Sequence, residues 1–111
     1  MTDLFRDGKK VVIRANAFVQ HDLVVTIIKV DAENKQILLS LDKPLINGSE
    51  RYQHAVASVR LVMDDLDTLV GVGILGCAVT WVPDGKFSQK NPFNLNWWRG
   101  GAAAITDLRT V

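Results

Sequence analysis

Residues 23–42 decide the fold of this chain, and they read LVVTIIKVDAENKQILLSLD. Two runs rich in β-branched and aliphatic residues, 23–30 and 36–42, flank the short polar segment 31–35. Such a segment between two β-rich runs is typical of a β-hairpin. Asn34 is predicted to take the left-handed conformation in the turn, because asparagine tolerates positive φ better than its neighbours.

Outward from this hairpin, short apolar segments alternate with turn residues. Ile37, Leu39 and Leu41 fall on one face of the second run and predict a side that faces the core. Pro44 and the Asn47-Gly48 pair interrupt the pattern and predict the end of the strand and a turn. The remaining β-rich segments predict strands at 9–19, 56–64, 68–82 and 93–98, with a last strand or short helix at 102–108.

The segment after Gly48 supports two interpretations. Asn47 and Glu50 have the spacing of a capping box, and apolar residues from Tyr52 onward recur at helical intervals. The valines between residues 56 and 63 favour a strand instead. We therefore expect a short helix at 49–55 followed by the strand 56–64.

Six or seven short strands in one chain of 111 residues predict a mainly β fold. The expected architecture is a single small barrel or split barrel with one short helix, and residues 1–111 form one domain. Closing the sheet would protect strand edges that this many valines and isoleucines otherwise expose to aggregation.

Composition narrows the function classes. A formal net charge of +1 lacks the basic excess typical of proteins that bind nucleic acid through phosphates. The N-terminus has no apolar segment of the signal-peptide kind, and the apolar run 69–82 is too short to span a bilayer. A cytoplasmic protein without a membrane span is therefore expected, and its one cysteine, Cys77, lies in an apolar run that predicts a buried, unreactive side chain.

A glycine-rich segment resembles a cofactor-binding motif but is better explained as part of a strand. Residues 71–76, GVGILG, match the dinucleotide fingerprint, but the β-branched sequence that follows does not predict the required helix, and no acidic residue lies about twenty positions on. Gly71 and Gly73 are expected on one face of a strand, where they admit a close neighbour. No cofactor is therefore expected.

The acidic and histidine residues do not predict a metal site or an active site either. Asp64, Asp65 and Asp67 lack the further oxygen ligands of a calcium loop and are expected in a polar turn. His21 and His54 have no second ligand at metal spacing, and His21 is expected to face solvent. With no nucleophile motif in the chain, we expect a protein that is not an enzyme.

The richest remaining constellation lies near the C-terminus. If 93–98 is a strand, Trp97 joins Phe93 and Leu95 in the core and Trp98 points to the other face. An exposed tryptophan beside an arginine is typical of binding hot spots, and the alternative is that Trp98 covers a barrel end. The candidate binding residues are Trp98, Arg99, Lys86, Phe87 and Lys90.

Residues 22–82 carry a partial resemblance to a known family. The runs 26–31 (TIIKVD) and 37–42 (ILLSLD), then the connector at Asn47, resemble the N-terminal β-barrel that precedes the PilZ domain of bacterial flagellar brake proteins. The resemblance implies a split barrel acting in cyclic di-GMP signalling and protein contact. The chain has no Arg-x-x-x-Arg pair, and Tyr52 stands where the second motif needs glycine, so no nucleotide-binding residue is carried over.

Together these observations predict a non-catalytic protein-binding or regulatory module of bacterial or phage type, whose partner is another protein or a second copy in a homodimer. The alternative is a small-barrel protein that binds single-stranded nucleic acid through Trp98, Phe87, Lys86, Lys90 and Arg99.

Overall fold

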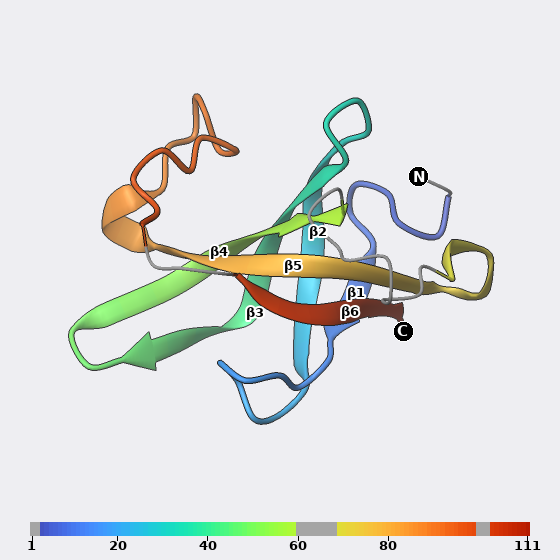
Figure 1. Ribbon diagram of the computed structural model, residues 1–111, viewed down its shortest axis with the longest axis horizontal. Coiled ribbons are helices and arrows are strands. Elements are labelled where there is room, and N and C mark those ends of the chain that lie inside the picture. Colours follow the sequence, from blue (N-terminus) through green and yellow to red (C-terminus); the bar gives the residue numbers. More distant parts are fainter. Residues whose placement is uncertain (1–2, 60–68, 100–102) are drawn as a thin grey trace.

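The computed structural model describes residues 3–59, 69–99 and 103–111 and shows a closed antiparallel barrel (Figure 1). Each strand pairs with the next in sequence, and the last pairs with the first. The strands are β1 (Lys10–Ile13), β2 (Leu23–Asp31), β3 (Gln36–Asn47), β4 (Glu50–Ser58), β5 (Ile74–Pro83) and β6 (Ala104–Thr110). The prediction of a mainly β small barrel with six or seven strands is confirmed, and six strands form the barrel. In the part of the chain described here, no helix has the length and apolarity needed to cross a membrane.

The hairpin that decides the fold forms as predicted, from β2 and β3. Ile37, Leu39 and Leu41 are buried in the main core, together with alternate residues of the other strands. Leu38 points the other way and packs outside the barrel with Val56. Alternation along each strand therefore separates an inner core from a smaller apolar cluster on the outer face.

The turn of this hairpin differs from the prediction in one residue. Lys35, and not Asn34, has the positive φ, at 54°. Asp31 explains the difference, because one of its carboxylate oxygens accepts a hydrogen bond from the backbone N–H of Asn34 at 3.2 Å and the other accepts one from the Asn34 side chain at 2.9 Å. These bonds hold Asn34 within the turn, and the left-handed position falls on the next residue.

The helix predicted at 49–55 is wrong, because these residues lie in the turn and first part of β4. Gly48, with φ of 64°, forms the two-residue turn with Ser49, and Asn47 pairs with Glu50 across it. Residues 56–58 of the strand predicted at 56–64 form the second part of β4, which ends at Ser58, and residues 60–64 lie outside the described part of the chain. Helical spacing of apolar residues was misleading because pairing to both β3 and β5 outweighs local preference.

Pro44 interrupts the pairing of β3 without ending the strand. The register between β3 and β4 shifts between Ser40 and Leu45, where Pro44 has no N–H to donate. Gln53 fills this gap, because its side-chain amide donates to the Leu41 carbonyl at 2.6 Å and to the Ser40 hydroxyl at 3.3 Å. A side chain therefore replaces the missing ladder bonds.

Other predicted boundaries also change. β1 covers only Lys10–Ile13 of the predicted strand 9–19, and the segment predicted at 102–108 is a strand, β6. The strand predicted at 93–98 is absent, since those residues form turns closed by backbone bonds from Asn94 to Asn91 and from Trp98 to Leu95. The predicted turn at Asp64, Asp65 and Asp67 lies outside the described residues.

The glycine motif lies before β5 and not within it. The strand predicted from residue 68 begins only at Ile74, after the 3-10 turn η2 (Val70–Val72). Gly71 lies in that turn, and Gly73 ends it with φ of 83°, so the two glycines do not share a strand face. The close approach expected of them is found at Gly73, where an added Cβ would collide with the Thr110 side chain, but not at Gly71.

Gly73→Ala should therefore lower the free energy of unfolding by about 1–3 kcal/mol, through positive-φ strain and the collision with Thr110. Gly71→Ala is the matched control, because its Cβ meets nothing within 4 Å, and we expect a change within about 0.5 kcal/mol. Urea denaturation followed by far-UV circular dichroism measures both. Equal effects of the two substitutions would contradict this packing.

Candidate aromatic binding site

An open cavity of about 540 Å³ lies at one end of the barrel. The last residues of β5, the first of β6 and the loop between β1 and β2 surround it. Its principal side chains are Phe18, Tyr52, Trp81, Trp98, Thr80 and Ile105. A cavity of this volume lies within the usual size range of ligand pockets.

Three aromatic side chains form a contiguous wall of this aromatic cavity. Trp81 belongs to the barrel core and is only 5% exposed. Phe18 stacks on it with ring centroids 4.6 Å apart and an interplanar angle of 25°, and Tyr52 meets Phe18 edge-on at 6.0 Å. The stack continues the core outward to a solvent-facing ring, so Phe18 is held in place although it is 46% exposed.

The loop between β1 and β2 positions Phe18. The Asn16 side-chain oxygen accepts hydrogen bonds from the backbone N–H groups of Phe18 and Val19, at 2.8 and 3.1 Å. The Asp22 carboxylate accepts one from the Ala15 N–H at 2.8 Å. Asparagine and aspartate thereby fix the loop through local side-chain to backbone bonds. Asn16 and Asp22 were available as turn signals in the sequence, but nothing there indicated that Phe18 meets Trp81.

Apolar side chains also surround the mouth of the aromatic cavity. Phe18, Trp98 and Ile105 are 46%, 37% and 45% exposed and lie on three separate segments. None of the side chains from residues 3–59, 69–99 and 103–111 that line the cavity is an aspartate, glutamate, lysine, arginine or histidine. A buried charge without a partner is costly, so the part of any occupant that enters the cavity has to be uncharged.

The five predicted binding residues do not form one surface. Trp98 lies at the aromatic cavity, whereas Phe87 and Lys90 line a separate hollow beside His54. Lys86 and Arg99 are exposed and line neither. The sequence therefore identified one residue of the cavity and missed Phe18, Tyr52, Trp81 and Ile105, whose meeting depends on closure of the barrel.

The residues 84–98, which we call the strap, lie against the outer face of the barrel (Figure 1). Its underside packs on an outer apolar cluster of three strand residues, Leu38, Val56 and Val82. The strap side chains in this contact are Phe87, Phe93, Leu95 and Trp97. Trp97 also meets Trp98 edge-on, with centroids 5.9 Å apart. The strap thereby links the outer cluster to the aromatic cavity.

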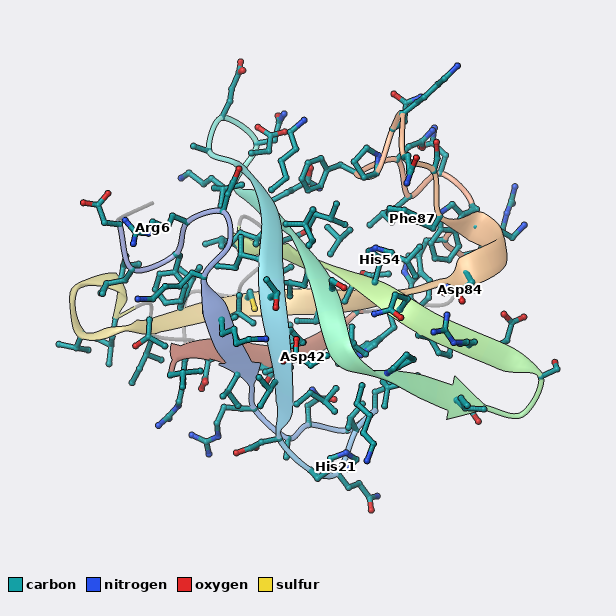
Figure 2. The ribbon with its side chains drawn as sticks, turned by 180° about the vertical axis from the view of Figure 1, so that it is seen from behind. Arg6, His21, Asp42, His54, Asp84 and Phe87 are labelled. Carbon is teal, nitrogen blue, oxygen red and sulfur yellow. The ribbon has the colours of Figure 1, made fainter. Side chains whose placement is uncertain are left out.

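At its start, the strap is fixed by a polar cluster and by a ring stack. Asp84 accepts a hydrogen bond from Arg51 at 2.5 Å and one from the Gln53 backbone N–H at 3.1 Å. The bond from Arg51 is the main reason why the pKa of Asp84 is below its usual value. His54 stacks on Phe87 with centroids 3.8 Å apart and planes 1° from parallel, and Figure 2 shows these two side chains grouped with Asp84.

The remaining candidate chemical groups are separate from the aromatic cavity. His21 is exposed in the loop between β1 and β2, far from His54 in Figure 2. Cys77 is buried in the core as expected, and burial raises the pKa of its thiol to about 12. No group of three or more histidine, cysteine or acidic side chains within residues 3–59, 69–99 and 103–111 is arranged to hold a metal ion.

Searches with this sequence and fold find no matching protein family, no matching curated protein and no matching solved structure. The resemblance to the barrel of flagellar brake proteins therefore stays a prediction, and the aromatic cavity is the candidate functional site of the chain.

Proposed function

We propose that this protein is a non-catalytic binding module that receives an apolar segment of another protein in its aromatic cavity. The observation behind this proposal is the position of three exposed apolar side chains, Phe18, Trp98 and Ile105, around the mouth of an uncharged cavity. Aromatic side chains at the rim of a desolvated pocket are the usual anchors of protein interfaces. As expected from the sequence, we place the module in the cytoplasm of a bacterial or phage system.

The distribution of apolar surface favours a protein partner over a small ligand. A small molecule inside the cavity would leave the outer faces of Ile105 and Trp98 in water. A protein surface would cover both the cavity and its rim, which is how a contiguous apolar patch is normally buried. The cavity has room for an aromatic side chain, which buries about 150–250 Å² of surface.

The chemistry of the lining favours a protein over nucleic acid as the partner. Binding of single strands combines stacking with lysine or arginine contacts to phosphates. No lysine or arginine in the described part of the chain lines the aromatic cavity, and Lys90 lies at the other hollow. A protein partner is therefore favoured over single-stranded nucleic acid, and the experiment below distinguishes the two.

Peptides selected from a displayed random library against the immobilised protein test the proposal. We expect the enriched peptides to share an apolar or aromatic anchor, and Ile105→Lys to weaken their binding at least about tenfold by placing a charge at the cavity mouth. Val72→Lys is the matched control, because Val72 is 72% exposed on η2, beyond the opposite end of β5. Isothermal calorimetry measures both variants, and thermal unfolding verifies that both fold.

Three results would overturn the proposal. One is selection of peptides whose binding is equally sensitive to the two lysine variants. Another is salt-dependent binding of a single-stranded oligonucleotide that survives Ile105→Lys, which would favour the alternative. The third is a homodimer, detected by light scattering, that Ile105→Lys dissociates, since the occupant of the aromatic cavity would then be a second copy.

A further inference from the structure

The strap connects a histidine to the aromatic cavity. At its start Phe87 stacks on His54, and near its end Trp97 packs on the outer cluster beside Trp98, which lines the cavity. No strand pairing holds the strap among the described residues, so side-chain contacts determine whether it stays docked. Trp98 follows Trp97 in the chain and contacts it edge-on, so docking of the strap is coupled to the position of Trp98.

The surroundings of His54, where its ring stacks on Phe87, favour the neutral form of the ring. Its Nδ1 atom is buried and has no hydrogen-bond partner within the described residues. Its ring lies flat against Phe87, where a charge is poorly solvated. The charged side chains around it, including those that line its hollow, are Arg51, Asp84, Lys29, Lys90 and Asp7. Among these charges, Asp84 has the larger effect on the pKa of His54 and favours a second proton, whereas Arg51 disfavours it, and burial of the ring is the main cause that lowers the pKa.

We propose that protonation of His54 releases the strap from the barrel and removes Trp98 from the wall of the aromatic cavity, so that binding there weakens in acid. The effect on binding rests on the proposed function, whereas the movement of the strap does not. Both states of the strap leave the six-stranded barrel closed.

The direction of the effect follows from the environment of His54. Burial is the main cause that lowers its pKa in the docked state, the Asp84 charge opposes this, and Arg51 adds to it. In the released state the ring is solvated and its pKa returns to about 6.5. Docking is therefore fully favourable above about pH 6.5 and loses stability as the pH falls from there toward the docked pKa.

Nuclear magnetic resonance of the full chain tests the movement of the strap without a partner. We expect the indole N–H signals of Trp97 and Trp98 to shift together with the ring signals of His54 as the pH falls below about 6.5, while the signal of the core residue Trp81 stays constant. His54→Phe keeps a ring stacked on Phe87 and removes the proton, so its strap signals should not change with pH. His21→Gln removes the exposed histidine and should behave as the native chain.

Fluorobenzene, observed by ¹⁹F relaxation, is the probe for the aromatic cavity because its charge does not change with pH. Its binding should weaken several-fold in acid in the native chain and stay constant in His54→Phe. The inference is overturned if His54 titrates without moving the strap signals, or if Trp81 shifts together with them, since the barrel would then open as one unit. A strap transition without fluorobenzene binding at any pH would support the movement and count against the proposed function alone.

Discussion

Trp81→Ala should lower the free energy of unfolding by about 3–5 kcal/mol, the cost of removing a large aromatic side chain from a core. Trp81 is 5% exposed, belongs to the main core and supports the stacked ring of Phe18. Its loss leaves a void that the rigid barrel strands cannot close. It also leaves Phe18 without the surface that holds it at the mouth of the aromatic cavity. Urea denaturation and fluorobenzene binding measure these two consequences separately.

Trp81→Phe is the matched control for this prediction. The Trp81 indole Nε1 is buried without a hydrogen-bond partner among the described residues, so phenylalanine removes no hydrogen bond. We expect a loss of only about 1–2 kcal/mol, with stacking on Phe18 retained. An alanine variant as stable as the phenylalanine variant would contradict the placement of Trp81 between the core and the cavity.

The sequence predicted the parts of the fold that local pattern determines. Ile37, Leu39 and Leu41 alternate with outward-facing residues, and the structure buries all three. The segment 49–55 was mistaken for a helix because its local spacing fits either element. Pairing with the two neighbouring strands, β3 and β5, selects the strand.

In the segment from Phe93 to Trp98, the predicted alternation of burial is present, but the predicted strand is not. Phe93, Leu95 and Trp97 are half-buried while the residues between them are exposed, as period-two alternation predicted. Their predicted place in the core is wrong, because they pack on the outer cluster of Leu38, Val56 and Val82. The backbone achieves this with turns and not with a strand. Alternation in a sequence reports which side chains face an apolar surface, and a strap on the outside of a barrel satisfies it as well as a strand inside.

The aromatic cavity was not predictable in the same way. Phe18 and Ile105 come from opposite ends of the chain, and they meet because β6 closes against β1. Trp98 was identified because period-two alternation placed it on the face opposite Trp97, beside Arg99. The residues that line the cavity with Trp98 are ordinary apolar residues, and their proximity follows only from the register of all six strands.

Trp97→Ala should lower the free energy of unfolding by about 2–4 kcal/mol, whereas Trp98→Ala should cost less than about 1 kcal/mol. Trp97 packs under the strap on the cluster around Val56, so its loss uncovers that cluster. Trp98 is 37% exposed at the aromatic cavity, and its contact with Trp97 is a single edge-on one. Both substitutions should weaken fluorobenzene binding. Trp98→Ala removes part of the cavity wall, and Trp97→Ala removes the side chain that supports Trp98.

The two alanine variants distinguish a residue that holds the strap in place, Trp97, from a residue that lines the aromatic cavity, Trp98. Urea denaturation gives the stability of each variant, and ¹⁹F relaxation gives probe binding under conditions where both are folded. Loss of stability is expected in Trp97→Ala alone, because Trp98 lies at the rim and not on the outer cluster. Equal, large losses of stability would mean that Trp98 is also a packing residue. Full probe binding in Trp97→Ala would mean that the strap does not position Trp98, and the link between the outer cluster and the aromatic cavity would be absent.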